Sequence, residues 1–186
     1  MGRLIYITNA SLDGSIEDAA GRLDWSDARG VHEYITELVR SIDTHVYGRR
    51  LYESMCYWEA PVDTFPADQQ AFARVWQQAR KVVVSRTLRE ASSRATCIVP
   101  QFDPEAIARL KATSSGDVLI GGANLASQAF DAGLVDECHL FLHPVLIGRG
   151  KPAFDVSTLR RLELIGTRSF DSGVVHVHSR VRRAAS

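Results

Sequence analysis

Residues 117–130 read DVLIGGANLASQAF. Val118, Leu119 and Ile120 form a continuous apolar run, which is typical of a strand buried in the middle of a parallel sheet. The two glycines that follow lead into an alanine-containing segment, which we expect to be a helix ending near Gly133. The stretch therefore reads as strand, tight turn and helix, which is the repeating unit of an α/β sheet.

The same alternation extends toward the N-terminus. Leu4–Ala10 is predicted to be a buried strand, and Gly30–Ile42 an amphipathic helix with one apolar stripe. Between them, residues 15–29 read as a polar loop that carries Trp25, and a loop of this length is more often functional than idle. We expect further strands at Thr44–Tyr47, Lys81–Ser85 and Ala95–Val99, and helices after Gly48, at Ala67–Ala79 and after the capping residue Asp103.

Strands alone follow after residue 137. Cys138–Ile147 is apolar and interrupted by Pro144, while Leu162–Phe170 and Val174–Val181 read as a hairpin. The predicted fold is therefore α/β, with a mostly parallel central sheet, an antiparallel C-terminal edge hairpin and helices on both faces. We expect residues 1–186 to form a single domain.

Composition excludes several functions. The 22 Lys and Arg balance the 22 Asp and Glu, whereas nucleic-acid or membrane binding calls for a basic excess, so neither partner is expected. Cys56, Cys97 and Cys138 are widely spaced and odd in number, which indicates reduced thiols. The N-terminus lacks the pattern of a signal peptide, so we expect a cytoplasmic protein.

Three strand ends are candidate phosphate sites. Gly48, Arg49 and Arg50 follow one strand and Gly121–Asn124 another, and each precedes a helix whose free N–H groups attract anions. Tight turning alone would explain either glycine turn, but two in one sheet favour phosphate binding. The third strand end, Ser85-Arg86-Thr87, offers two hydroxyls and a guanidinium to a 2′-phosphate, or is simply a solvated strand exit.

Several stretches then match a known family in order. They are SLDG, LDWS, GRRLYESM, KVVVSRTL, DVLIGGANLASQAF and VDECHLFLHPVLIGRGKPAFD, and they span nearly the whole chain. The chain resembles the dihydrofolate reductase-like superfamily, most closely the C-terminal reductase domain of the bacterial riboflavin-biosynthesis deaminase-reductase and its stand-alone relatives. The resemblance implies a three-layer, dihydrofolate-reductase-like fold that binds NADPH.

The resemblance also implies where NADPH would lie. Arg49 would meet the pyrophosphate, and Arg86 the adenosine 2′-phosphate. The family's GRxT motif often ends in threonine, and here Leu51 stands in that position and cannot donate to a phosphate. The residues implied for the pyrophosphate are Gly48 and Arg49; for the 2′-phosphate, Ser85 and Arg86; for the nicotinamide side and diphosphate, Gly121, Gly122, Ala123 and Asn124; and for the nicotinamide border, Asn9, Ala10 and Gly14.

The resemblance does not extend to the folate site, so we expect a substrate other than folate. True dihydrofolate reductases keep a carboxylate on the first helix, and that position falls near His32 in this chain. His32 is a candidate proton donor because imidazole titrates near neutrality, although a surface or half-buried histidine is the alternative. We expect NADPH-dependent hydride transfer to a small heterocyclic or carbonyl substrate. The alternatives are reduction of the ribosylaminopyrimidine intermediate of riboflavin synthesis and nucleotide binding without turnover.

Four histidines lie on the C-terminal strands. His139 and His143 are expected to share one face of their strand, as are His176 and His178. No cysteine or acidic cluster in the sequence completes a metal site, so we predict no metal and interpret them as polar strand positions or interface residues.

The C-terminal strands also predict an assembly. Leu140, Leu142, Val145 and Ile147 are expected near the antiparallel edge of the sheet. Long apolar edges pair with another chain unless they are covered. We therefore expect a homodimer, whereas packing of these strands entirely against the chain's own helices would leave a monomer.

Overall fold

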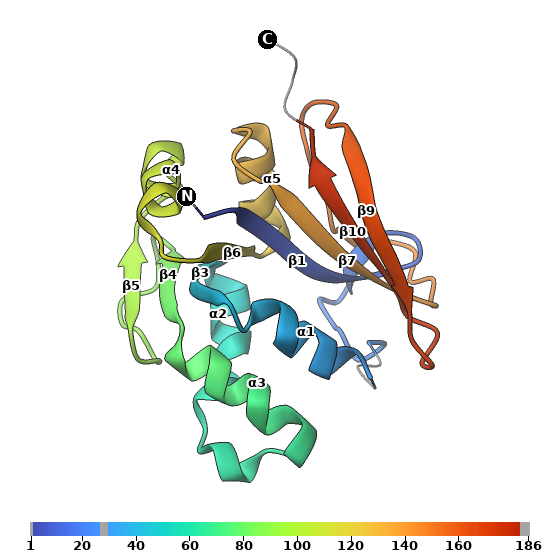
Figure 1. Cartoon of the computed structure of the whole chain (residues 1–186), viewed down its shortest axis with the longest axis horizontal. Helices are drawn as coiled ribbons and strands as arrows, with labels where there is room; N and C mark the ends of the chain where they lie inside the picture. Colours follow the sequence, from blue (N-terminus) through green and yellow to red (C-terminus); the bar gives the residue numbers. More distant parts are fainter. Residues whose placement is uncertain (1, 27–29, 183–186) are drawn as a thin grey trace.

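A twisted sheet with the strand order β5-β4-β3-β6-β1-β7-β10-β9 runs through the molecule (Figure 1). The structure is a computed structural model, and it describes residues 2–26 and 30–182. The strands are β1 Leu4–Ser11, β3 Ile42–Gly48, β4 Arg80–Val84, β5 Thr96–Val99, β6 Asp117–Gly121, β7 Glu137–His143, β9 Leu162–Ser169 and β10 Val175–Val181.

The sheet is parallel except at one edge. β5, β4, β3, β6, β1 and β7 pair in parallel, with Tyr6 of β1 opposite both Ile120 and Cys138. β10 then runs antiparallel to β7 and to β9. The predicted α/β class and the C-terminal hairpin are thereby confirmed.

Helices cover both faces of the sheet. α1 (Val31–Val39), α2 (Arg49–Met55) and α3 (Ala67–Gln78) bury apolar side chains with Tyr47 and Leu119 on one face. α4 (Pro104–Thr113) and α5 (Ala123–Asp131) do the same with Tyr6 and Ile120 on the other. Two 3₁₀ helices, η1 (Cys56–Glu59) and η2 (Val62–Thr64), connect α2 to α3. The core is thus divided by the sheet into two halves.

Local signals explain most boundaries. The Asp103 side chain caps α4, as predicted, by accepting a 2.9 Å hydrogen bond from Glu105 N–H. α1 ends at Val39, earlier than predicted, because Ile42 is buried as the first residue of β3 rather than on the helix stripe.

The predicted loop at residues 15–29 is partly wrong. Ser15–Asp18 forms strand β2, which pairs antiparallel with β8 (Gly150–Pro152) in a small second sheet. Residues 27–29 of that loop lie outside the described part of the chain. Four residues reading SIED carry no alternating apolar pattern, and their partner lies far away in the sequence, so no local signal marks this strand.

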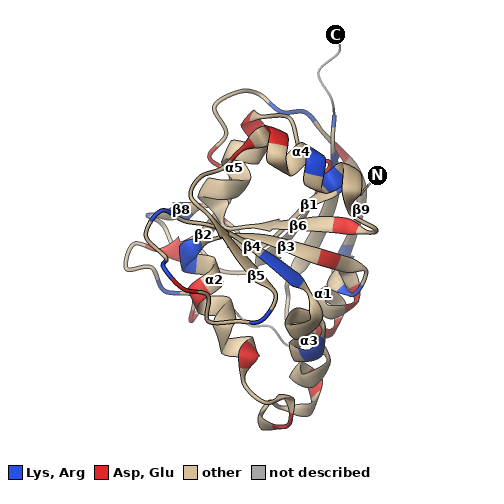
Figure 2. Ribbon diagram, turned by 90° about the vertical axis from the view of Figure 1, so that its left-hand side faces the viewer, with Lys and Arg blue, Asp and Glu red and all other residues tan. Residues whose placement is uncertain are grey.

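Other surface properties follow the composition. Acidic and basic residues are interspersed over the helices and loops of the view in Figure 2. Cys56, Cys97 and Cys138 are free thiols. In the described ranges, no helix is both long and apolar enough to cross a bilayer.

One buried histidine makes stability depend on pH. His45 of β3 is 1% exposed, and its Nδ1 lies 2.9 Å from the Tyr47 hydroxyl. Burial, together with the nearby Lys81 charge, lowers the pKa of His45 to about 3. Since the unfolded chain binds this proton near pH 6.5, stability is complete above that pH and is lost as the pH falls toward 3.

We expect this histidine alone to remove about 1.4 kcal/mol of unfolding free energy at one pH unit below its unfolded pKa. Urea unfolding of the wild type and of His45→Gln at pH 7.5 and 5.5 measures the effect. The variant should be less stable at pH 7.5 yet lose less stability between the two values. Equal losses in both proteins would contradict the assignment.

Candidate functional site

The site is defined by where the parallel strands end. β1, β6, β3 and β4 all finish at the same edge of the sheet, because parallel neighbours point the same way. After β3 the chain enters α2 on one face, and after β6 it enters α5 on the other. Such a divergence opens a crevice at the strand ends, which is where α/β sheets bind ligands.

The two glycine turns meet in this crevice. Gly122, which has φ of 93°, is so placed that a Cβ added to it would lie 3.7 Å from the backbone nitrogen of Gly48. Gly48 itself faces open space, since a Cβ there would have no atom within 4 Å. A ligand can therefore approach the backbone at Gly48, next to the uncapped first turn of α5 that contains Ala123 and Asn124.

Leu51 packs beneath these turns. A Cβ on Gly121 would come within 2.6 Å of Leu51 Cδ2 and 3.0 Å of the Tyr47 ring. Leu51 belongs to the apolar core on this face and therefore contributes packing where the family often has a hydroxyl. Polar contacts to a phosphate at this turn must come from backbone N–H groups and from basic side chains nearby.

The predicted basic residues occupy different environments. Arg49 lies on the exposed side of α2 and forms a 3.0 Å ion pair with Glu53. Ser85 Oγ accepts hydrogen bonds from the N–H groups of Thr87 (3.2 Å) and Leu88 (2.9 Å), so it holds the turn after β4. Arg86, between them, is exposed to solvent. The arrangement leaves the guanidinium of Arg86 accessible beside a fixed turn.

A cleft of mixed charge lies beside the start of α2 and was missed by the sequence analysis. It has a volume of about 470 Å³, and its basic lining residues are Arg50 in the first turn of α2, Arg149 and Lys151. Glu17 and Asp18 of β2 line it as well, and Lys151 pairs with Glu17 at 3.9 Å. In Figure 2, β8 and α2 lie on the same side of the molecule. The glycine-flanked basic residues in IGRGKP were a usable signal, but only the β2–β8 pairing brings them to α2.

Asn9 and His143 meet at the ends of β1 and β7. Asn9 Oδ1 lies 3.1 Å from His143 Nε2, and the Trp25 ring stands edge-on to the His143 ring with 5.5 Å between centroids. His143 is 1% exposed, and Ala10 is fully buried beside this pair. The sequence analysis assigned His143 to a polar strand or interface position, yet it lies among the residues expected to border the nicotinamide.

Hydrogen bonds join the segment at residues 11–14 to the segment at residues 145–148 next to this pair, and we call them the Asp13 clasp. The Asp13 carboxylate accepts hydrogen bonds from the Ser11 hydroxyl and from Gly148 N–H, which lower its pKa and keep it ionised. Leu12 N–H donates to Val145 at 2.9 Å, and Gly14 accepts from Ala153 N–H at 2.8 Å. Gly14 has φ of 83°, so a residue with a side chain would be strained there.

His32 lies in an aromatic cluster. Its ring stacks on Trp58 with 5.3 Å between centroids and contacts Phe72 at 5.0 Å. Burial lowers the pKa of His32, which favours the neutral ring. Its role as a proton donor stays a prediction.

The fold is defined by the strand order, by the antiparallel edge and by the helices that follow β3 and β6 on opposite faces of the sheet. The fold is that of the dihydrofolate reductases: the Enterococcus faecalis enzyme, solved in complex with NADP(H) and the ligand RAB-propyl, superposes with a TM-score of 0.65 at 15% identity, covering 99% of this chain and 98% of that one. The predicted dihydrofolate-reductase-like fold is thus confirmed.

The family is narrower than the fold. The RibD C-terminal domain model matches residues 3–176, so the chain belongs to this family. Members of the family are reductases. The uncharacterized protein YyaP of Bacillus subtilis (strain 168) is 34% identical over 177 residues, which are 94% of this chain and 93% of YyaP. A putative riboflavin biosynthesis protein from Shewanella sp. PV-4 is 21% identical, with a TM-score of 0.77 and coverage of 97% and 99%.

Proposed function

We propose that this protein is an NADPH-dependent oxidoreductase that transfers hydride to a small heterocyclic or carbonyl substrate other than folate. The observation that carries the proposal is the close approach of the Gly48 turn and the Gly121–Gly122 turn at the strand ends. Membership of the RibD C-terminal domain family supports a reductase. The free thiols fit a cytoplasmic enzyme.

The residues present fit a dinucleotide phosphate. The open backbone at Gly48 and the uncapped first turn of α5 supply N–H groups, and Arg50 and Arg149 supply positive charge. Arg86, supported by the turn that Ser85 holds, would meet the 2′-phosphate. When bound, NADPH supplies the hydride.

The remaining side chains orient the reactants and exclude water. The Asn9 amide is fixed by His143, and Trp25 covers the His143 ring. His143 is thus a positioning residue for Asn9, and it is a second candidate, besides His32, for a nearby proton source. The Asp13 clasp holds the loops at residues 11–14 and 145–148 together beside this pair.

Two alternatives remain open. Reduction of a ribosylaminopyrimidine, as in riboflavin synthesis, is favoured by the family and by the name of the Shewanella relative. Nucleotide binding without turnover is favoured by Leu51, which replaces a hydroxyl with an apolar side chain. Following NADPH oxidation with ribosylaminopyrimidines, pteridines and simple carbonyl compounds separates the three.

Calorimetry should show that NADPH binds at least about tenfold more tightly than NADH, because a charge-assisted hydrogen bond contributes about 1.5–3 kcal/mol. Arg86→Gln should bring the two affinities together. Equal affinities in the wild type would remove Arg86 from the site, and absence of binding to either nucleotide would overturn the reductase proposal.

Gly48→Ala tests the strand-end site directly. Since φ at Gly48 is −73° and no atom lies near the added methyl group, the melting temperature should hardly change. NADPH affinity should fall by about tenfold or more, because the methyl group occupies the surface that the diphosphate would contact. Gly166→Ala on β9, where the space is equally open, is the matched control and should bind normally. Normal binding in Gly48→Ala would show that the site is misplaced.

We also propose a two-fold dimer built on the C-terminal strands. On the face of the sheet opposite α1, Leu164 and Leu162 of β9 stand opposite Ser179 and Val181 of β10. Leu164 is 62% exposed, and β9 is an eight-residue edge strand. A second copy of this strip would cover both copies, as in an isologous interface.

Light scattering at micromolar concentration should give twice the 20.6 kDa chain mass, and Leu164→Glu should give one chain mass because it buries a charge in the interface. Tyr57→Glu, an equally exposed position on η1, is the control and should stay dimeric. A single-chain mass for the wild type over the accessible range would end the dimer proposal.

A further inference from the structure

A second cluster of polar side chains lies at the opposite end of the sheet from the strand-end crevice. Glu137 and His139 are two residues apart at the start of β7, so they point to the same face. His178 of β10 stands directly opposite His139 in the antiparallel register. The sequence analysis grouped these histidines but found no acidic partner, and the structure provides one in Glu137.

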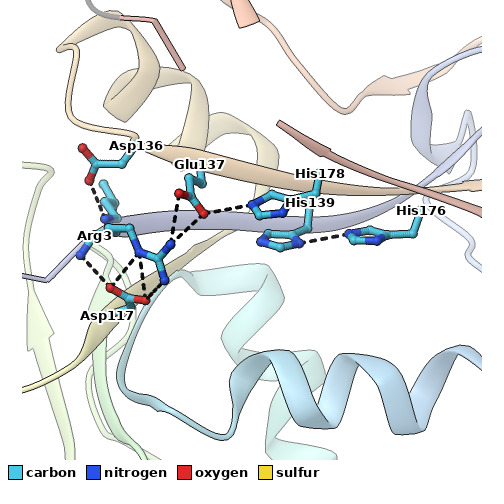
Figure 3. Close-up of polar contacts among 8 residues, drawn as sticks. Arg3, Asp117, Asp136, Glu137, His139, His176 and His178 are labelled. Atoms are coloured by element: carbon cyan, nitrogen blue, oxygen red, sulfur yellow. Dashed lines mark hydrogen bonds and ion pairs between the residues drawn. The ribbon is translucent and has the colours of Figure 1, made fainter. Parts of the chain in front are cut away.

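The three side chains converge (Figure 3). One ligand atom from each of Glu137, His139 and His178 lies within 4.8 Å of the others. His178 Nε2 is 2.9 Å from Glu137 Oε2, and the rings of His139 and His178 stack with 4.0 Å between centroids. Neighbouring ligands of a tetrahedral zinc ion are about 3.3 Å apart, given bonds of about 2.0 Å. The two rings, which stack with 16° between their planes, would therefore have to tilt toward a common point to bind one ion.

One nitrogen of His139 is held by a neighbouring side chain, as in many metal-binding histidines. Its Nδ1 is 2.9 Å from His176 Nε2, which leaves Nε2 as the free nitrogen of the ring (Figure 3). Metal-binding histidines nearly always use their second nitrogen in such a bond, because it fixes both the tautomer and the ring. His176 is itself held by stacking on Phe141, with 4.6 Å between centroids.

We propose that Glu137, His139 and His178 bind a divalent transition-metal ion of the zinc type, with solvent completing the coordination. Two imidazoles and one carboxylate are a ligand set that favours zinc, cobalt or nickel over magnesium or calcium, which prefer oxygen alone. Glu137 and His139 are buried, whereas the His178 side chain is 22% exposed and gives the ion a route from solvent.

Arg3 competes with the metal for Glu137. Its Nη1 lies 3.0 Å from both oxygens of the Glu137 carboxylate. The same guanidinium also binds Asp117 through Nε and Nη2, and the side chain is 52% exposed, so it can release Glu137 and keep Asp117. In the absence of metal, Arg3 and His178 stabilise the buried carboxylate; with metal, the ion takes over that role. Arg3 thus sets the metal affinity.

This cluster is separate from the proposed nucleotide site. Glu137 is the first residue of β7 and His143 the last, so the metal cluster and the Asn9–His143 pair lie at opposite ends of one strand. The inference rests on the Glu137, His139 and His178 geometry and not on NADPH binding, so either can fail without the other.

Titration of tag-free, metal-stripped full chain with Zn²⁺ and with Co²⁺ tests the proposal. We expect one ion per chain, micromolar or tighter affinity, a visible Co²⁺ absorption band and a rise in melting temperature with Zn²⁺. His178→Gln and Glu137→Gln should each weaken Zn²⁺ binding by about tenfold or more, as loss of one ligand does. Glu163→Gln, an exposed acid on β9, is the control and should bind as the wild type does.

Arg3→Gln gives a readout that a purely structural cluster would not produce. It should tighten Zn²⁺ binding several-fold, because it removes the competing cation. Unchanged affinity in this variant would remove Glu137 from the ligand set and overturn the site as proposed. Absence of a Co²⁺ band in the folded wild type, or wild-type affinity in His178→Gln, would overturn it equally.

Discussion

The absence of a side chain at Gly121 is the constraint on which the rest of this structure depends. Leu51 and the Tyr47 ring occupy the space that a Cβ would take, which holds α2 against the end of β6. Because α2 and α5 leave their strands on opposite faces, this contact creates the crevice at the strand ends and places the turns at Gly48 and Gly122 side by side. Packing and binding geometry therefore have the same origin.

Local sequence signals predicted the sheet and helices well, since a buried strand such as β6 and a capped helix such as α4 can be recognised from a few consecutive residues. They also indicated the glycine turns, and the family resemblance predicted which part of NADPH each turn would meet. The sequence did not predict which residues are brought together by long-range strand pairing. Arg149 and Lys151 reach α2 only through the β2–β8 sheet, and His143 reaches Asn9 only through the β1–β7 register. Periodicity carries no information on such pairings.

The sheet has two chemically different ends. At the carboxyl ends of the strands, the exposed backbone at Gly48 lies close to the arginine side chains of α2. At the amino end of β7, a buried carboxylate is balanced by Arg3 and by a histidine from β10. Parallel strands account for this difference, because they gather all of their starts at one edge and all of their ends at the other.

The Asp13 clasp has a mechanical consequence. The loops at residues 11–14 and 145–148 are joined by one carboxylate and by the backbone bond from Leu12 to Val145, so moving one loop away from the other would break these hydrogen bonds. The two segments are remote in sequence, yet these hydrogen bonds couple the position of one to that of the other.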